Sequence, residues 1–545
     1  MAPTRKERAE ASATGHTTGS AEAAGADAAP PAGLRNLAKL MAMLPSDAAA
    51  AKRGGEHKFW KTQPVMQPED NPQLAPGPIH ANTPPEKVRA EPLPLPADFA
   101  WVTVDLDDAA QLQEVHDLLT ANYVEDDDAT MRFKYSAEFL HWALRHPGFD
   151  KSWHVGVRVV STQKLVAFIA GIPHELRVGE LSLHSTEINF LCVHKRLRSK
   201  RLAPVLIKEV TRRCNLAGVF QAIYTVGSVL PTPMSCARYY HRTLNAQKLL
   251  ETGFSSVPLG MDRDAHIARF ELPSATQLPG LREMTADDVA AVGHLLRRYL
   301  RRFDMAPQFT DEEVAHLFLS GRGQDTNGVP GRRGQVTWTY VVECDGRITD
   351  MASFYSLPST VLDGSTEHST LEAAYLFYYA TDAAWAGADA GAPPVAPPPR
   401  TDLSPYAAAV NAGVPLWQRS ALSRLTPAEA ADEAGATSWR EESLQTKARL
   451  KTRLTALMQD MLVLAKQSKF DVVNCLTVMD NALFAADLKF GPGDGFLRFY
   501  LFNWRTEPIP GGIGARADEQ GLDPAAEMSP GPPSVYGAGN GIVMV

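Results

Sequence analysis

The sequence is poor in cysteine, has no long apolar run and carries no excess of positive charge. Its five cysteines are odd in number and form no C-x-x-C pair, so we expect reduced thiols rather than a disulfide framework or a zinc site. No stretch approaches the roughly 20 apolar residues of a membrane span, and the N-terminal region lacks the apolar core of a secretory signal. A formal charge of −8 argues against general binding of nucleic acid. These absences favour a soluble, cytoplasmic protein without an integral membrane segment.

Length and composition divide the chain into regions. Its 545 residues suffice for two domains with separate cores. Residues 1–55 are rich in Ala, Ser, Gly and charge, which predicts a disordered N-terminal arm. Residues 384–439 are heavy in Ala, Pro and Gly and predict an insert, with a short helix at 427–433. Residues 506–538 predict an extended, turn-rich tail.

Hydrophobic periodicity predicts helices and strands in mixed order. The expected helices are 112–122, 137–145, 286–302, 311–319 and 451–467, and the expected strands are 153–160, 165–172, 336–344, 348–357 and 372–380, with two further strand segments in 181–193. No regular βαβ repeat links them. A mixed sheet flanked by helices, in the α/β (α+β) class, is therefore the simplest fold.

A strand, a cationic loop and a helix start follow one another in residues 187–218. Residues 188–193 are β-rich and apolar, and apolar positions recur at helical spacing from Leu202 until Gly218 ends the helix. The cations between them are Lys195, Arg196, Arg198, Lys200 and Arg201. Unpaired N–H groups and the helix dipole attract anions at such a point, which favours a phosphate site. A solvated helix start, a nucleic-acid contact or a localisation signal would look the same.

The spacing of this loop is typical of one ligand. Arg198, Arg201 and Ala203 fit the pattern Arg/Gln-x-x-Gly-x-Gly/Ala, by which acyl-CoA-dependent acetyltransferase folds hold the coenzyme A pyrophosphate, although Arg201 stands where a glycine is usual. Residues 187–213, the pair Tyr224-Thr225, residues 238–241 and residues 489–504 closely resemble the glycylpeptide N-tetradecanoyltransferase (N-myristoyltransferase) family. The resemblance covers nearly everything from residue 56 to 545, apart from the insert and the tail.

The resemblance implies an architecture and an activity. It implies two tandem acetyltransferase-like (GNAT-like) halves: residues 56–260, which bind acyl-CoA, and residues 261–545, which form the peptide groove. It further implies transfer of a myristoyl group from myristoyl-CoA, as cosubstrate, to the N-terminal glycine amine of a protein, with no permanently bound cofactor and no metal. This chain begins Met-Ala, so it does not qualify as its own substrate.

The resemblance also assigns the catalytic groups. The backbone N–H groups of Phe190 and Leu191 would form the oxyanion hole, and the carboxylate of the last residue, Val545, would be the base. Thr225, assisted by Asn189, would hold the neutral glycine amine. Without the resemblance, the segment around Phe190 would be an ordinary core strand, the apolar chain end an edge strand that closes the sheet, and Thr225 and Asn189 polar residues at strand ends.

Binding residues follow from the same resemblance. The coenzyme and its acyl group would contact Lys58, Phe59, Trp60, Phe190, Leu191, Cys192, Val193, Arg198, Ser199, Lys200, Arg201, Leu202 and Ala203. The peptide groove would contain Tyr123, Val124, Glu125, Asp126, Asp127, Phe133, Tyr135, Tyr239, His241, Tyr355, Ser359, Tyr375 and Asp494. Residues 59–60 would equally anchor an N-terminal arm, and the acidic run could form a solvated turn, although it lacks the spacing of a calcium loop. We assign His241 to the groove rather than to general base catalysis.

Other functions fit part of the sequence. A short-chain acyl-CoA N-acetyltransferase would share the phosphate loop, and a non-catalytic acyl-CoA or peptide-binding module would share the whole cavity. Nucleic-acid binding would use only the basic loop and is disfavoured by the acidic net charge. The expected partners are myristoyl-CoA and N-terminal glycine peptides or proteins, with ribosomes as a further candidate, and we expect a monomer.

Overall fold

The computed structural model describes residues 57–68, 70, 75–123, 131–227, 229–321, 324–326, 329–362, 367–385, 438–512 and 537–545. The predicted N-terminal arm, most of the predicted insert with its short helix, and residues 513–536 of the predicted tail lie outside these ranges. Of the predicted site residues, Val124, Glu125, Asp126 and Asp127 also lie outside them, and the side chains of Ser199 and Asp494 are not described.

Helices and strands follow one another in mixed order along the described chain. Up to residue 243 the elements are η1 (Trp60–Thr62), β1 (Phe99–Thr103), α2 (Ala109–Asn122), β2 (Met131–Phe133), α3 (Ala137–Leu144), β3 (His154–Val159), β4 (Leu165–Val178), β5 (Leu181–Val193), η4 (Lys195–Lys200), α4 (Leu202–Leu216), β6 (Gln221–Val226) and β7 (Ser235–Thr243). Beyond it they are α5 (Ala246–Glu251), α6 (Arg263–Ala268), β8 (Leu281–Glu283), η5 (Ala286–Asp288), α7 (Val289–Leu300), β9 (Met305–Pro307), α8 (Asp311–Ala315), η6 (His316–Ser320), β10 (Gln324–Thr326), β11 (Val329–Arg333), β12 (Thr337–Cys344), β13 (Arg347–Ser356), β14 (Ser359–Val361), β15 (Thr370–Leu371), β16 (Ala373–Thr381), α12 (Leu444–Gln467), β17 (Val472–Leu476), α13 (Asn481–Ala485) and β18 (Gly491–Phe502).

The predicted elements are present, with differences that have local causes. Residues 181–193 form one strand, β5, rather than two segments, because a bulge bends the strand without ending its pairing with β4. The expected helix at 451–467 begins earlier, at Leu444, where the side chain of Ser443 accepts a hydrogen bond from the N–H of Thr446 and caps the first turn. The cationic loop forms a short 3-10 helix, η4.

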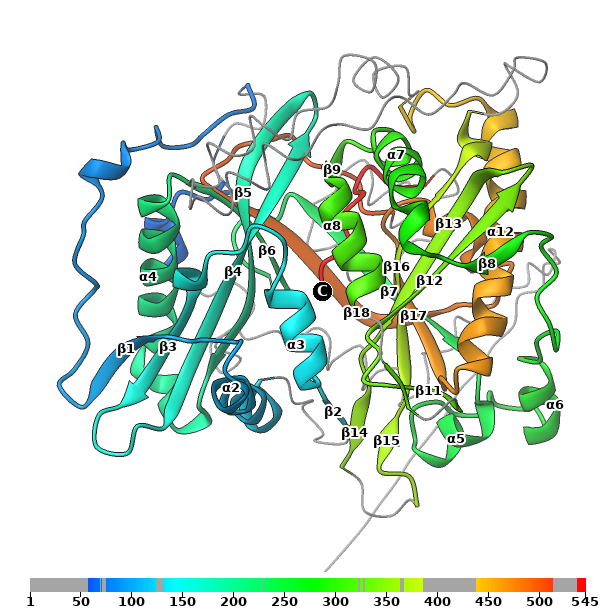
Figure 1. Ribbon diagram of the computed structural model, residues 1–545, viewed down its shortest axis with the longest axis horizontal. Helices are drawn as coiled ribbons and strands as arrows, with labels where there is room; N and C mark the ends of the chain where they lie inside the picture. The colour runs from blue at the N-terminus through cyan, green and yellow to red at the C-terminus, as the bar shows by residue number, and fades with distance from the viewer. Residues whose placement is uncertain are drawn as a thin grey trace, which may run out of the picture.

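One large mixed sheet runs through the molecule (Figure 1). Its strand order is β1-β3-β4-β5-β6-β18-β7-β17-β16-β13-β12-β8, with β9 paired to β4. Most neighbours are antiparallel, whereas β5 with β6 and β16 with β17 are parallel. Strand β18, from late in the sequence, lies between β6 and β7 and joins the early and late parts of the chain. The α/β class with a mixed sheet flanked by helices is therefore confirmed.

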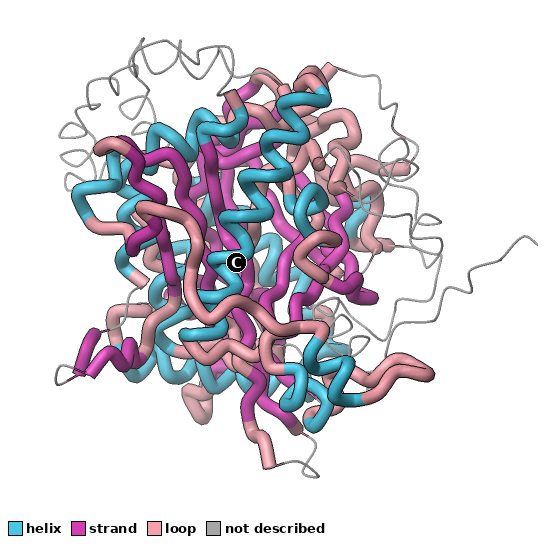
Figure 2. The backbone as a smooth tube through the Cα atoms, turned by 90° about the vertical axis from the view of Figure 1, so that its right-hand side faces the viewer, coloured by secondary structure: helices cyan, strands magenta, loops and turns pink. Residues whose placement is uncertain are grey.

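Helices cover the sheet and exclude water from it (Figure 2). Helix α4 packs against β3, β4 and β5, while α7 and α12 both pack against β13 and β16. All nine residues of β16 are buried, as expected of a strand whose two faces are both covered. None of the helices in the described ranges combines the length and apolarity that crossing a membrane requires.

The end of the chain lies inside the molecule. Two views at right angles both place the C-terminus near the centre of the fold (Figures 1 and 2). The chain leaves the described region at Gly512, beside Thr477, and re-enters at Gly537, whose neighbour Ala538 donates to the carbonyl of Met479. Both ends of the long tail therefore meet near β17. Because the entropic cost of loop closure rises slowly with length, the intervening residues are compatible with a fixed chain end.

Aromatic side chains join α3 to the later strands. Trp142 of α3 lies 6.3 Å from the ring of Tyr355 in β13 and 5.9 Å from that of Phe377 in β16. Its indole N–H donates to the carbonyl of His316 at 3.3 Å. Trp142 is buried, so its ring fills space between elements that are distant in the sequence. It should therefore contribute strongly to the stability of the whole fold.

We predict that Trp142→Ala lowers the free energy of unfolding by about 3–5 kcal/mol, because it leaves a cavity between α3, β13 and β16. Urea denaturation followed by fluorescence and circular dichroism measures this change. The control is Leu259→Ala, since Leu259 is fully exposed, and it should change stability by no more than about 0.5 kcal/mol. Equal effects of the two variants would contradict this prediction.

Candidate active site

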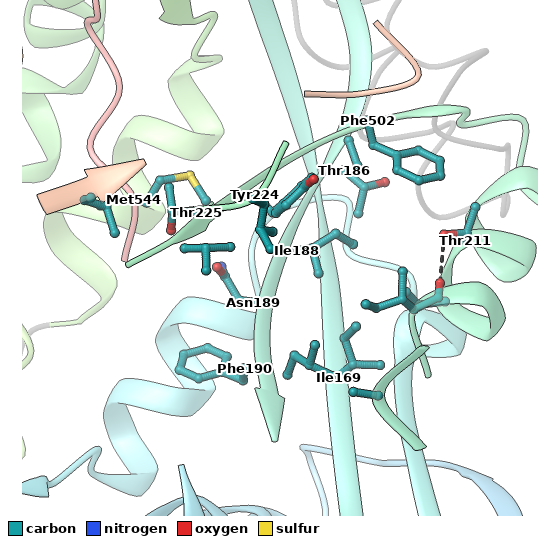
Figure 3. Close-up of a pocket in the computed structure, with 18 of the residues that line it drawn as sticks. Ile169, Thr186, Ile188, Asn189, Phe190, Thr211, Tyr224, Thr225, Phe502 and Met544 are labelled. Atoms are coloured by element: carbon teal, nitrogen blue, oxygen red, sulfur yellow. Dashed lines mark hydrogen bonds between the residues drawn. The ribbon is translucent and has the colours of Figure 1, made fainter. Parts of the chain in front are cut away.

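An apolar cavity of about 380 Å³ lies beside β5. Its walls come from η1, β5, α4, β6, β13, β16 and the last two residues of the chain. Figure 3 shows Met544 and Thr225 on one side and Thr211 on the other, with Ile188 and Asn189 between them. Thr211 donates its hydroxyl to the carbonyl of Ile207 at 2.8 Å, which removes a polar group from the wall. Such a space suits a long apolar ligand with a polar end.

A β-bulge interrupts β5 at the wall of this cavity. In the pairing of β4 with β5, Phe168 faces Cys192 and Ala170 faces Asn189, so one residue of β4 lies opposite both Phe190 and Leu191. Phe190 has a φ of 56°, in the left-handed region that non-glycine residues rarely adopt. A bulge leaves part of the backbone outside the ladder. The wall of the cavity therefore contains an irregular, bulged stretch of strand at Phe190 and Leu191.

The basic segment ends in a left-handed residue. Arg201 has a φ of 57° and directly precedes helix α4. The acetyltransferase pattern places glycine here, and the conformation explains that preference, because a left-handed backbone favours glycine. Arg198 donates to the backbone carbonyls of Asn122 and Val193, which attaches the segment to the end of α2. Only Ala203 and Pro204 of the helix start line the cavity.

The last nine residues are held by backbone and side-chain contacts. Ile542, Val543 and Met544 are buried, and Val545 lines the cavity. The N–H of Val543 donates to the hydroxyl of Tyr378 at 3.0 Å, and that hydroxyl donates to the carbonyl of Val543 at 3.3 Å. The N–H of Ile542 donates to the side chain of Asn540 at 3.0 Å. The chain end is therefore ordered rather than frayed, unlike most termini.

A buried carboxyl lies next to the chain end. Glu187 accepts a hydrogen bond from the amide of Asn189 at 2.8 Å, and one imidazole nitrogen of His174 lies 3.5 Å from its other oxygen. Burial raises the pKa of Glu187 to about 7, although Asn189 and the backbone of Val545 lower it in part. Burial also lowers the pKa of His174 to about 4, so this imidazole is neutral near pH 7. Near pH 7 the surroundings of the chain end therefore contain a neutral imidazole and a carboxyl that is about half ionised.

The cavity gathers many of the predicted site residues. Those that line it are Lys58, Phe59, Trp60, Tyr123, Phe133, Tyr135, Asn189, Phe190, Leu191, Ala203, Thr225, Tyr239, Tyr355, Tyr375 and Val545. Burial raises the pKa of the phenols of Tyr239, Tyr355 and Tyr375, which keeps them uncharged. They come from β7, β13 and β16, so both parts of the chain contribute to one space.

Other predicted residues lie away from the lining. These are Cys192, Val193, Arg198, Lys200, Arg201, Leu202, His241 and Ser359. His241 is buried with its Nδ1 2.6 Å from the side-chain oxygen of Asn474, and burial lowers its pKa to about 4. An imidazole with so low a pKa is a weak base near pH 7, and the predicted groove role of His241 stays a prediction.

Several lining residues were not predicted. They include Ile169, Thr186, Ile188, Ile207, Val210, Cys214, Phe220, Phe502 and Met544. Val210 and Cys214 occupy helical positions that the apolar spacing does reveal, but nothing local distinguishes a residue facing a cavity from one facing a core. No group of three or more His, Cys, Asp or Glu side chains suited to a metal ion occurs in the part of the chain that the structure describes.

The fold and site have the features of an acyl-CoA-dependent acyltransferase. Family models for the N-terminal and C-terminal domains of myristoyl-CoA:protein N-myristoyltransferase match residues 78–237 and 251–526. Glycylpeptide N-tetradecanoyltransferase of Mycosarcoma maydis is 59% identical over 517 residues, covering 90% of this chain and 72% of its own length. The Saccharomyces cerevisiae enzyme is 44% identical over 88% of this chain and 94% of its own. A crystal structure of S. cerevisiae N-myristoyltransferase with bound myristoyl-CoA has a TM-score of 0.73 at 41% identity, covering 90% of this chain and 99% of that one. The chain belongs to the myristoyl-CoA:protein N-myristoyltransferase family.

We predict that Glu187 makes stability depend on pH. With an unfolded pKa of 4.5 and a folded pKa of about 7, the stabilising contribution is complete below pH 4.5, declines as the pH rises and is lost above about pH 7. Relative to the neutral variant Glu187→Gln, the protein should therefore lose about 2.5 kcal/mol of stability between pH 5 and pH 8. Urea denaturation at both pH values measures the difference.

The matched control is Glu313, a second carboxyl whose pKa burial raises to about 7 and which does not line the cavity. Glu313→Gln should show a pH trend of the same sign. If the stability difference between Glu187→Gln and the parent chain is the same at pH 5 and pH 8, Glu187 does not titrate as inferred.

Proposed function

We propose that this chain transfers the myristoyl group of myristoyl-CoA to the N-terminal glycine amine of a peptide, with backbone amides at Phe190 and Leu191 stabilising the oxyanion and the carboxylate of Val545 removing the amine proton. The observation that carries the proposal is the meeting of a β-bulge and a buried chain end in one apolar cavity. The names of the relatives indicate which acyl group is transferred and that glycine accepts it.

The apolar wall supports a long acyl chain over a short one. Ile169, Ile207, Val210 and Cys214 line the cavity and offer no charge. Burying about twelve methylenes of a myristoyl chain is worth roughly 10 kcal/mol at most, whereas an acetyl group gains almost none of this. An acetyl group in this cavity would leave most of the space unfilled. The cavity therefore favours the tetradecanoyl donor.

The bulge supports oxyanion stabilisation. As the amine nitrogen attacks the thioester carbonyl carbon, the C=O π electrons move to oxygen, and collapse of the intermediate expels the coenzyme A thiolate. Backbone N–H groups are fixed dipoles that need no reorganisation in that step. Phe190 and Leu191 lie at the irregular part of β5, where the bulge interrupts the ladder beside the cavity.

The buried chain end supports proton removal. A free α-carboxyl titrates near about 3.5 and an N-terminal amine near about 8, so transfer between unperturbed groups is uphill by about 6 kcal/mol. Burial raises the pKa of a carboxyl and lowers that of an ammonium, so the apolar enclosure narrows the gap from both sides. Thr225 and Asn189 line the same cavity and would hold the neutral amine by hydrogen bonding.

The remaining assignments complete the proposal. Residues 56–260 would bind acyl-CoA, with the coenzyme phosphates on η4 and the start of α4, and residues 261–545 would form most of the peptide groove. His241, Ser359 and the acidic loop would border that groove. The protein would act as a cytoplasmic monomer, with ribosomes as a candidate partner during synthesis of its substrates.

Removal of Met544 and Val545 should slow the chemical step by about 10² or more, because the proton acceptor is lost. Single-turnover transfer to a peptide beginning with glycine measures the rate, and a separate titration measures affinity for myristoyl-CoA, which should change little. An alternative non-catalytic module predicts binding with no turnover in either protein. Unchanged single-turnover rates after truncation would refute the role of Val545.

A series of acyl-CoA donors tests the length preference. Transfer efficiency to the same peptide should rise with chain length up to fourteen carbons, because each added methylene gains about 0.8 kcal/mol of burial until the cavity is full. The measurement is kcat/KM for each donor. Preference for acetyl-CoA would reject the myristoyl proposal in favour of a short-chain acetyltransferase.

A further inference from the structure

A buried ionic cluster surrounds Arg302, far from the bulge. Arg302 and two carboxylates, those of Glu442 and Asp480, are all almost completely buried. The guanidinium donates Nε to Glu442 and one terminal N–H to Asp480 at 2.7 Å. Tyr299 donates its hydroxyl to the same Asp480 oxygen at 2.5 Å, and Lys447 lies 2.8 Å from Glu442. Although burial raises the pKa of Asp480, Arg302 and Lys447 outweigh it and hold that pKa below its usual value.

The residues next to this cluster hold the returning C-terminal segment. Asp304 and Met305, just after Arg302, donate their N–H groups to the carbonyl of Gly539 at 2.8 and 3.1 Å. Met479, just before Asp480, donates its N–H to the carbonyl of Asn540 at 2.8 Å, and Gly541 donates to the carbonyl of Met305 at 2.8 Å. The segment at 537–541 thus lies between two stretches of chain that the ion pair of Arg302 with Asp480 ties together.

A third stretch closes the same region. Trp439 donates its backbone N–H to the carbonyl of Arg302 at 3.0 Å and its indole N–H to the carboxylate of Asp304 at 3.2 Å. Arg440 pairs with the same carboxylate at 2.9 Å. Trp439 is the last residue of the predicted insert and Arg440 follows it, so the chain that returns from the insert contacts the stretch that holds the C-terminal segment. Glu442, two residues further on, completes the cluster.

We propose that Arg302, Asp480 and Glu442 act as positioning residues that fix residues 537–541 and thereby set the place of the Val545 carboxylate. This proposal rests on the proposed function, because positioning of the chain end matters for the rate only if the Val545 carboxylate takes part in the reaction. From Gly541, four residues lead to Val545, and the only side-chain hydroxyl bonded to them in the described structure is that of Tyr378. Together with the hydrogen bonds of Gly539 and Asn540 to Pro510 and Ser235, the cluster therefore sets where this short end begins.

The cluster would matter for the rate because a catalytic group must be placed precisely. A displacement of about 1 Å in a catalytic group can cost up to about 100-fold in rate. Charged partners in a buried site hold a geometry more stiffly than exposed ones, since solvent does not compete for them. Loss of one carboxylate charge leaves Arg302 with a single acidic partner and should let the three stretches shift against each other.

The test is Glu442→Gln, which keeps the side-chain size and removes one charge. We expect the single-turnover rate of acyl transfer to fall about 10-fold or more, with affinity for myristoyl-CoA changed less than about twofold. The matched control is Asp350→Asn, because Asp350 is also fully buried and paired with an arginine, Arg453, at 2.8 Å. Asp350→Asn should lower the melting temperature but leave the transfer rate unchanged.

A double-variant cycle separates positioning from general destabilisation. In a chain that lacks Met544 and Val545, Glu442→Gln should have no further effect on the residual rate, since there is no terminal carboxylate at the site to misplace. The milder variant Trp439→Phe removes the indole hydrogen bond to Asp304 and part of the ring beneath Arg440 and Lys447, but keeps an aromatic side chain and every charge of the cluster. It should show the same pattern with a smaller loss of rate, so the proposal stays testable if Glu442→Gln folds poorly.

The outcomes distinguish the two proposals. If truncation alone leaves the rate unchanged, Val545 is not the base. The positioning proposal is then refuted as well, because it depends on that role. If truncation slows transfer but folded Glu442→Gln and Trp439→Phe transfer at the parent rate, only the positioning proposal fails. An equal loss from Glu442→Gln in the full-length and truncated chains would also overturn it.

Discussion

Burial of a chain end inside an apolar cavity is the constraint on which this structure depends. A terminus has no following residue to hold it, so its position must come from contacts along the segment before it. Asn540, Gly541 and Val543 supply these contacts through hydrogen bonds to β9, to the turn after β17 and to Tyr378. The surrounding tyrosines and His174 are neutral near pH 7 and so add no charge to the enclosure.

The sheet brings the bulge and the buried chain end together. Strand β5 carries the bulge, and its neighbour β6 carries Thr225 and pairs with β18. On the far side of β18, the strands β7, β17 and β16 continue the same sheet toward Tyr375 and Tyr378. The cavity therefore belongs to no single half of the chain. Its walls depend on the pairing of strands that are hundreds of residues apart.

Local sequence patterns predicted much of this arrangement. The features that they did not predict depend on contacts between residues distant in the sequence. The strand, cationic segment and helix of residues 187–218 follow from apolar spacing, and the family pattern marks Arg201 as unusual at a position that proves to be left-handed. The buried state of Glu187 could not be predicted, because its pKa depends on residues such as His174 and Val545. Likewise, no local signal joins Arg302 to Glu442 across 140 positions, or places β18 between β6 and β7.

The position of β18 also bears on how the protein is made. Strands β6 and β7 are consecutive in the sequence but are not neighbours in the sheet, because β18 separates them. A ribosome that has finished β7 must add about 260 more residues before Phe502 emerges. At typical translation rates this takes roughly 15 to 50 s. During that interval one edge of β6 and both edges of β7 lack their partners, because β17 also follows late in the sequence, so the early sheet stays open until synthesis is nearly complete.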